Sequence, residues 1–397
     1  MVSPLRRSVC VISVLTLLSS TGCAGSALSG SSGADTGAPL KIGVVVPLTG
    51  PIGQAGTALR RGFELGVAKV NDAGGIGGKK VEYVVVDDAG DPANSTQLAR
   101  RLVQQDKVSV LFGTITGDTA EAVGKVSDDN KIPFLTAILG DPEQCRPYQW
   151  GFGESTRQLL TPMLPQLLQK YGNRVAVVGS DYNYPRLYAG LAKELTQAGG
   201  GTVVAEEYSP IGQTDWQPVI ARLKAADPDV LLSMVVGADA IAFSQQAQQF
   251  GLLTPELGFE GAPLDADYHP ALSALTTGRH HAVRWADGMT DPASRQFVSD
   301  YRSTHQWNAP IPEVAGNAYF GIQFVLAAAA KAGNDPAAIN REIGSLKFDS
   351  PLGTGTHFAS NNHILQAEMF DATISPDGYT VTAKFGPVAD TVARKGC

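Results

Sequence analysis

A strand, a helix and a second strand follow one another early in the chain, and this order narrows the choice of folds. Residues 42–46 are a short, apolar, β-branched run of the length of a buried strand. Residues 55–71 carry apolar side chains at helical spacing, and Gly74 and Gly75 follow where that helix should end. Residues 81–86 form a second strand-like run. The unit predicts a crossover between two parallel strands in a sheet with helices on both faces.

The same unit recurs along the chain, which is 397 residues long. Strands and helices are predicted to alternate as far as residue 171 and again from residue 174 to residue 260. This length exceeds that of an ordinary single core, so we expect two α/β domains. After residue 265 the pattern changes to an alanine-rich helix over 315–332, followed from residue 348 by strands and turns. A tail of this kind implies that the chain passes between the two domains more than once.

The N-terminal segment predicts export. Arg6 and Arg7 precede an apolar run over 9–18 that is too short to span a bilayer, and small residues then lead to Cys23. This order resembles a bacterial lipoprotein signal, in which residues 1–22 are removed and Cys23 carries lipid; the alternative is an ordinary secretory signal. Residues 23–39, rich in glycine, serine and alanine, are predicted to be a flexible tether.

The remaining cysteines and the overall charge limit the partners further. Cys10 is removed with the signal, which leaves Cys145 and Cys397 in an oxidising compartment, either disulfide-bonded or as two free thiols. The formal net charge of −7 argues against nucleic acid as a partner. We therefore expect an exported protein held at the membrane by lipid, with no nucleic-acid role.

Enzymatic motifs are missing from the sequence. There is no G-x-S-x-G elbow, no H-E-x-x-H motif and no paired C-x-x-C. The six histidines lack metal-ligand spacing and are interpreted as solvent-exposed loop residues. The glycine run after residue 73 follows a helix and opens a strand, which is the reverse of a phosphate loop. Asp87, Asp88 and Asp91 are interpreted as a solvated turn and a helix cap. We predict a non-enzyme with no metal and no other cofactor.

Residues 47–92 resemble the opening of type I periplasmic solute-binding proteins of the branched-chain amino acid family. The most specific parts of this resemblance are the NDAGGIGG run and the Asp-Asp strand end. The second half contains GSDYNYPR, which is most similar to the amide- and urea-binding branch of that family. The resemblance implies an α/β fold of two lobes, each a doubly wound, mainly parallel sheet flanked by helices, joined by a hinge of several crossovers. We expect residues 40–155 and 287–345 to form lobe 1, and residues 156–286 and 346–397 to form lobe 2.

The resemblance also implies a ligand site in the cleft between the lobes. In lobe 1 the site residues follow two strand ends: the first group is Thr114, Thr116, Gly117 and Asp118, and the second is Thr136, Ala137 and Ile138.

In lobe 2, Tyr182 and Tyr184 lie beyond a strand end, where each either touches the ligand or packs under its loop. Gly237, Glu260 and Asp265 follow the next strands, and either carboxylate could pair with a ligand ammonium group or be solvated.

The function that the resemblance implies is the capture of a small polar solute for an ABC importer. The solute would be a short amide, urea or an amino acid, and the transmembrane permease subunits would be the protein partner. A ligand sensor of the same fold that reports to a regulator is the alternative.

Overall fold

The computed structural model describes residues 38–397 except 139–144, 266–267 and 391. The predicted signal peptide, the lipidation site Cys23 and most of the predicted tether lie outside the described residues.

The first sheet contains five parallel strands in the order β2-β1-β3-β4-β5. Its strands are β1 (Lys41–Val46), β2 (Glu82–Asp87), β3 (Val110–Gly113), β4 (Phe134–Thr136) and β5 (Gln149–Gly151). The helices between them are α1 (Gly53–Asp72), α2 (Pro92–Gln104) and α3 (Gly117–Asn130). The predicted crossover unit is confirmed, and α1 ends before Gly74 and Gly75, which both have positive φ.

Both faces of this sheet are buried, because successive side chains of a strand point to opposite faces. Val44 and Val46 of β1 belong to the core formed with α1, whereas Val45 belongs to a separate core formed with α2 and α3. This arrangement explains why residues 42–46 are continuously apolar rather than alternating. Asp91 caps α2, as predicted, by accepting a hydrogen bond from the Asn94 backbone N–H at 2.7 Å, but Asp88 is fully buried rather than solvated.

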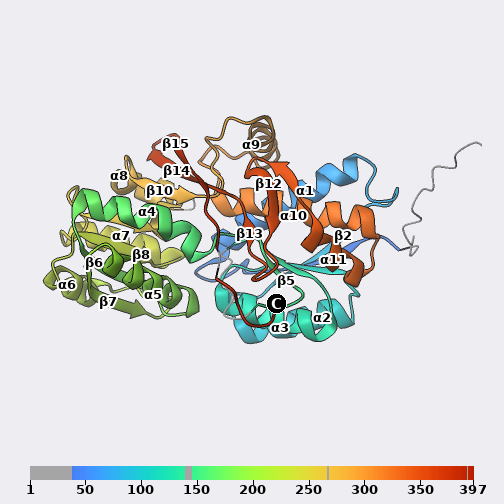
Figure 1. Cartoon of the computed structure of the whole chain (residues 1–397), viewed down its shortest axis with the longest axis horizontal. Coiled ribbons are helices and arrows are strands. Elements are labelled where there is room, and N and C mark those ends of the chain that lie inside the picture. Colours follow the sequence, from blue (N-terminus) through green and yellow to red (C-terminus); the bar gives the residue numbers. More distant parts are fainter. Residues whose placement is uncertain (1–37, 139–144, 266–267, 391) are drawn as a thin grey trace, which may run out of the picture. The chain divides into compact units, whose positions relative to one another are not determined.

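The second sheet contains four parallel strands in the order β7-β6-β8-β9. They are β6 (Arg174–Ser180), β7 (Thr202–Ser209), β8 (Val230–Met234) and β9 (Gly258–Gly261). Helices α4 (Thr156–Tyr171) and α5 (Asn183–Ala198) cover one face, and α6 (Gln217–Ala225) and α7 (Ala238–Gln249) cover the other, as the green elements of Figure 1 show. The alternation predicted for this half of the chain is confirmed.

The rest of the chain forms two small antiparallel sheets and five helical segments. It contains η1 (Ala262–Leu264), α8 (His269–Thr276), β10 (His280–Val283), α9 (Pro292–His305), α10 (Glu313–Ala332), α11 (Pro336–Ser345), β11 (Phe348–Ser350), β12 (Gly353–Phe358), β13 (Leu365–Gln366), β14 (Glu368–Ser375) and β15 (Gly378–Pro387). Strands β10, β14 and β15 form one antiparallel sheet, and β11, β12 and β13 form another.

Helix α10 packs against α1 at a close distance. A Cβ atom on Gly62 of α1 would lie 2.0 Å from the Ala315 carbonyl oxygen, so only glycine fits at that position. Phe324 of α10 packs against Phe152, with ring centroids 5.6 Å apart. The predicted apolar helix is therefore confirmed, and it joins the core of the first sheet.

The C-terminal strands divide between the two lobes. Phe358 of β12 packs on Trp150 of β5 at a centroid distance of 5.3 Å, and Ile364 bridges to Gly151, so residues 348–366 lie with the first sheet. The sequence-based division had assigned residues 346–397 to lobe 2. Strand β14 instead pairs with β10, and β15 pairs with β14 (Figure 1). Strand β10 in turn contacts β9 of the second sheet.

The last residues return to lobe 1, where Cys397 is disulfide-bonded to Cys145 with Cα atoms 5.3 Å apart. His363 lies close enough to both sulfur atoms for the three side chains to have the spacing of metal ligands. Because a disulfide offers no thiolate ligand, this cluster is not a metal site in the structure.

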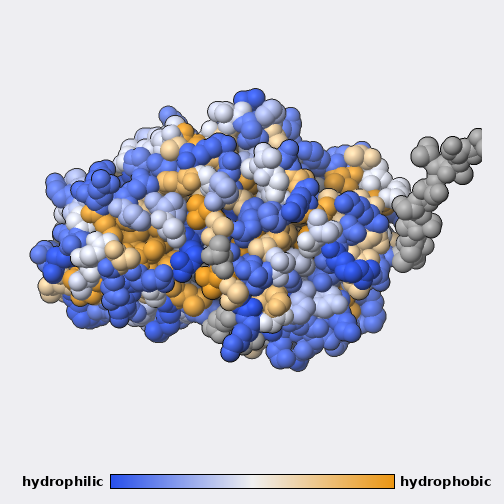
Figure 2. All heavy atoms as spheres, viewed as in Figure 1, coloured by the Kyte–Doolittle hydropathy of each residue, from blue (hydrophilic) through white to orange (hydrophobic). Residues whose placement is uncertain are grey.

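The surface is mainly hydrophilic. Figure 2 shows hydrophilic residues over most of the visible face, with hydrophobic residues in scattered patches. No helix within the described residues is both long and apolar enough to cross a bilayer.

Candidate functional site

A cavity of about 110 Å³ lies where the carboxyl ends of both sheets meet. Lobe 1 contributes the start of α1, the β3–α3 loop and the start of α10, and lobe 2 contributes the start of α5 and the segments after β8 and β9. Its lining residues are Ile52, Ala55, Ile115, Thr116, Ile138, Glu154, Leu159, Tyr182, Tyr184, Tyr188, Met234, Val236, Gly237, Glu260, Gly261, Ala262, Asp265, Tyr268, His281, Glu313, Val314 and Asn317. This is where open α/β sheets bind ligands.

The structure brings together part of the predicted site. Seven predicted residues line the cavity: Thr116, Ile138, Tyr182, Tyr184, Gly237, Glu260 and Asp265. Five do not: Thr114, Gly117, Asp118, Thr136 and Ala137.

The five residues that do not line the cavity have other surroundings. The Thr136 hydroxyl donates to the Trp150 carbonyl oxygen at 3.3 Å, and Thr114 and Ala137 are buried in the first lobe. Gly117 lies against Asn183, where a Cβ atom would be 2.3 Å from the Asn183 Oδ1. Asp118, in the first turn of α3, is near enough to Tyr182 for its charge to act on that phenol. Gly117 and Asp118 thus lie at contacts between the lobes.

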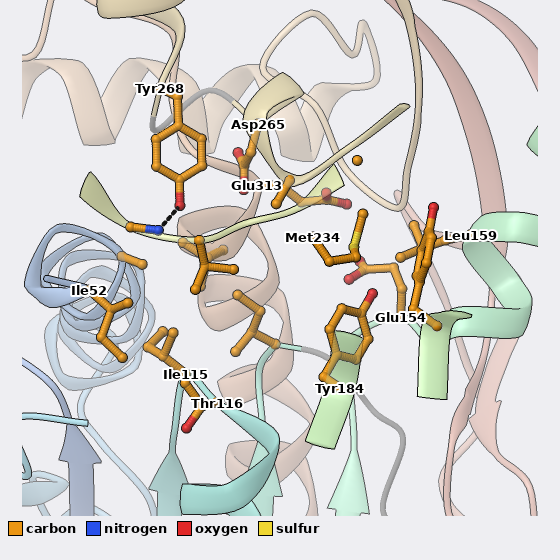
Figure 3. A pocket seen from close by; sticks show the side chains of 18 of the residues that line it. Ile52, Ile115, Thr116, Glu154, Leu159, Tyr184, Met234, Asp265, Tyr268 and Glu313 are labelled. Carbon is orange, nitrogen blue, oxygen red and sulfur yellow. Dashed lines mark hydrogen bonds between the residues drawn. The ribbon is translucent and has the colours of Figure 1, made fainter. Parts of the chain in front are cut away.

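One side of the cavity is apolar. Figure 3 shows Ile52 and Ile115 on this side, next to Thr116. Ile138, Val236 and Val314 are further apolar residues of the lining. The hydroxyl of Thr116 is already used to cap α3, because it accepts from the Thr119 backbone N–H. This side can therefore hold an apolar body but offers few hydrogen bonds.

Tyrosines form a second part of the wall. The rings of Tyr182 and Tyr184 stack at a centroid distance of 6.4 Å, and Tyr188 lies next to Tyr184. Burial, and then the charge of Asp118, raises the pKa of Tyr182, and burial and then Glu260 raise the pKa of Tyr188. Both phenols are therefore neutral. The Tyr268 hydroxyl accepts from the Gly237 N–H at 2.8 Å, which is the dashed line in Figure 3.

The opposite side of the cavity is acidic. Four carboxylates reach it: Glu154 before α4, Glu260 in β9, Asp265 after η1 and Glu313 at the start of α10. Figure 3 shows Glu154, Asp265 and Glu313 away from Ile52 and Ile115. Glu154 and Glu260 are only 3% and 2% exposed, so bulk water does little to stabilise their charges.

His281 is the partner of Glu260. Its Nδ1 lies 2.7 Å from the Glu260 Oε1, in a site where the histidine is 8% exposed. Burial opposes protonation, but Glu260, followed by Asp265 and Glu154, outweighs it and raises the pKa of His281. The interpretation of the histidines as solvent-exposed loop residues is wrong for His281, which is buried in strand β10 and lines the cavity.

Arg284 supplies the second positive charge. Its side chain is fully buried and donates to the Phe152 carbonyl oxygen and to the Gln158 Oε1, the latter at 2.6 Å. Its Nε lies 3.9 Å from the Glu154 Oε1. Arg284 therefore offsets part of the acidic charge from behind the wall.

Glu313 is the most perturbed carboxyl group of the cavity. Burial and then the charges of Glu154 and Asp265 raise the pKa of Glu313 well above its ordinary value. Its Oε1 accepts the backbone N–H groups of Arg284 and Trp285. Its surroundings thus favour the protonated form of Glu313, and its Oε1 holds the segment that leads from β10 towards α9.

The matching family model, described as periplasmic binding protein, covers residues 39–378. This chain belongs to the periplasmic binding protein family. The predicted resemblance to its branched-chain amino acid type is confirmed, and proteins of this family bind solutes and are not enzymes.

Curated relatives of this periplasmic binding protein include a Leu/Ile/Val-binding protein homologue from Brucella melitensis, 26% identical over 87% of this chain and 93% of the relative. Another homologue, from Brucella suis, is 26% identical over 91% of this chain and 88% of its own length.

Solved structures show the same two-lobed fold. A solute-binding protein of an ABC transporter from Rhodopseudomonas palustris, in complex with 3,4-dihydroxybenzoic acid, has a TM-score of 0.78, 24% identity and coverage of 89% of this chain and 99% of its own. A leucine-binding protein from Thermotoga maritima has a TM-score of 0.75, 17% identity and coverage of 88% and 99%.

Proposed function

We propose that this periplasmic binding protein captures a small polar solute in the cavity and delivers it unaltered to the permease subunits of an ABC importer. The observation that carries the proposal is the cavity at the carboxyl ends of both sheets, which is lined by hydrogen-bonding groups as well as apolar groups. Its lining comes from both lobes, so relative motion of the lobes would open and close it.

The lobes touch beside the cavity, as expected of a closed form. The Ala238 backbone N–H at the start of α7 donates to the Pro51 carbonyl oxygen at 3.1 Å, and Gly117 packs against Asn183. Each hydrogen bond to a solute would contribute about 0.5–1.5 kcal/mol, and several are needed to offset the cost of closure.

The candidate solutes are those that the sequence resemblance implies, namely a short amide, urea or an amino acid. Titration calorimetry of the purified protein against this panel, with benzoate as an anionic comparison, tests the capture. Replacing Tyr182, which is 7% exposed in the cavity wall, with alanine should weaken binding at least tenfold, whereas Tyr83→Ala on the surface should leave it unchanged. Equal affinities for the two variants would remove Tyr182 from the site.

Delivery is tested in the cell. Lipid on Cys23 would hold the protein at the membrane, and the lobes would reach the permease on the tether that follows. Deleting the gene should abolish uptake of the solute, and a Cys23→Ser variant should be released from the membrane fraction. Normal uptake without the protein would leave a sensory role as the better account.

A further inference from the structure

We propose that the ligand of this cavity is a cation, namely a primary amine or a guanidine carried on a compact apolar body. This inference rests on the proposed capture function and specifies its substrate class. The geometry that points to it is an acidic cluster, two buried acceptor atoms without partners and an apolar wall facing them.

Acidic side chains outnumber basic ones in the lining of the cavity. The four acidic lining residues are Glu154, Glu260, Asp265 and Glu313, and the basic lining residue is His281, whose Nδ1 lies 2.7 Å from the Glu260 Oε1. Arg284 lies behind the wall, with its Nε 3.9 Å from the Glu154 Oε1. No lysine or arginine of the described chain lines the cavity. The lining therefore favours a ligand that carries positive charge.

Two acceptors at the cavity have no hydrogen-bond partner within the described residues. The Oε2 of Glu260 is one, on a side chain that is 2% exposed and whose other oxygen is bonded to His281. The Oδ1 of Asn317 is the second, on a side chain 1% exposed whose Nδ2 donates to the Glu154 Oε1 at 2.8 Å. Buried acceptors without partners are costly, so a ligand that donates hydrogen bonds to both would gain stability from them.

These features favour a donor-rich cation over other polar solutes. An ammonium group donates three hydrogen bonds and a guanidinium group five, and neither accepts any. A carboxylate placed among these side chains would instead add negative charge where the existing excess is not screened by water. The apolar side of the cavity, formed by Ile52, Ile115 and Ile138, would hold the hydrocarbon part of the ligand.

Four compounds with the same isobutyl body but different charge test the inference by calorimetry at pH 7. They are 3-methylbutylamine, 3-methylbutanamide, 3-methylbutanoate and leucine. The amine should bind at least tenfold more tightly than the other three. Equal or tighter binding of leucine, the amide or the carboxylate would overturn the cation assignment and leave solute capture intact.

A second measurement decides the outcome if none of the four binds. Cationic, neutral and anionic fractions of a rich growth medium, separated by ion exchange, are each added to the protein in a thermal-shift assay. Stabilisation by the cationic fraction alone supports the inference, and stabilisation by either of the other two overturns it. No stabilisation by any fraction would contradict solute capture itself.

Variants identify which carboxylate binds the cation. Their binding is measured with the tightest-binding amine or with the cationic fraction. Glu260→Gln keeps the side-chain shape and removes one carboxylate, so amine affinity should fall at least tenfold while affinity for the neutral amide changes less. Glu256→Gln, on an exposed loop, is the matched control and should bind as the wild type does. If Glu260→Gln fails to fold, Asp265→Asn serves in its place. Unchanged cation binding in the folded variant would overturn the inference.

Discussion

Arg284 balances buried acidic charge from behind the cavity wall, and its replacement tests that balance. Arg284→Met keeps most of the apolar stem but removes the charge and both hydrogen bonds, which leaves the Phe152 carbonyl and the Gln158 Oε1 without their donor. It also leaves Glu154 without the cation 3.9 Å away. Breaking a fully buried charged arrangement costs about 3–5 kcal/mol. We therefore expect the thermal midpoint to fall by on the order of 10 °C.

The control for this prediction is Lys125→Met. Lys125 forms an ion pair with Asp129 at 3.3 Å, and the two side chains are 66% and 56% exposed. Surface pairs contribute only about 0–1 kcal/mol, so this variant should unfold within a few degrees of the wild type. Scanning calorimetry of the wild type and both variants measures the difference. A similar small loss for both variants would refute the charge-balancing role of Arg284.

Three further predictions concern stability. His281 has a raised pKa in the folded protein. Its ion pair therefore stabilises the protein at a pH below the unfolded-state pKa, and this stabilisation is lost as the pH rises through the folded-state pKa. The difference in the free energy of unfolding between the wild type and His281→Asn, measured in urea, should be larger at pH 6 than at pH 9. Replacing Cys145 and Cys397 with serine should cost about 2–4 kcal/mol, and a reducing agent should lower the midpoint of the wild type but not of the double variant. Gly62→Ala should destabilise the protein by about 1–3 kcal/mol, because the added Cβ would meet the facing helix. Gly190→Ala, on an open helix surface, is the control and should stabilise the protein by up to about 1 kcal/mol. Equal thermal midpoints for the two variants would contradict the packing argument.

Helices and strands could be predicted from the sequence because their apolar spacing is local. Residues 42–46 were predicted as a strand, and β1 spans Lys41–Val46. Tyr182, Gly237 and Glu260 could be placed near a ligand site because the ends of parallel strands converge at one edge of a sheet.

Side chains that reach the cavity by tertiary contact were missed. Glu154 lies in a loop before α4, and Arg284 follows a short antiparallel strand whose pairing with β14 spans about ninety residues of chain. No periodic pattern marks such positions. One signal was present, because Glu313 and Asn317 are four residues apart on one face of an otherwise apolar helix.

Glu313 belongs to two structural units at once. One of its oxygens holds the backbone of Arg284 and Trp285 after β10, and the same side chain lines the cavity. A ligand that formed a hydrogen bond with this carboxyl group would therefore contact, with no intervening residue, the group that fixes the backbone leading towards α9.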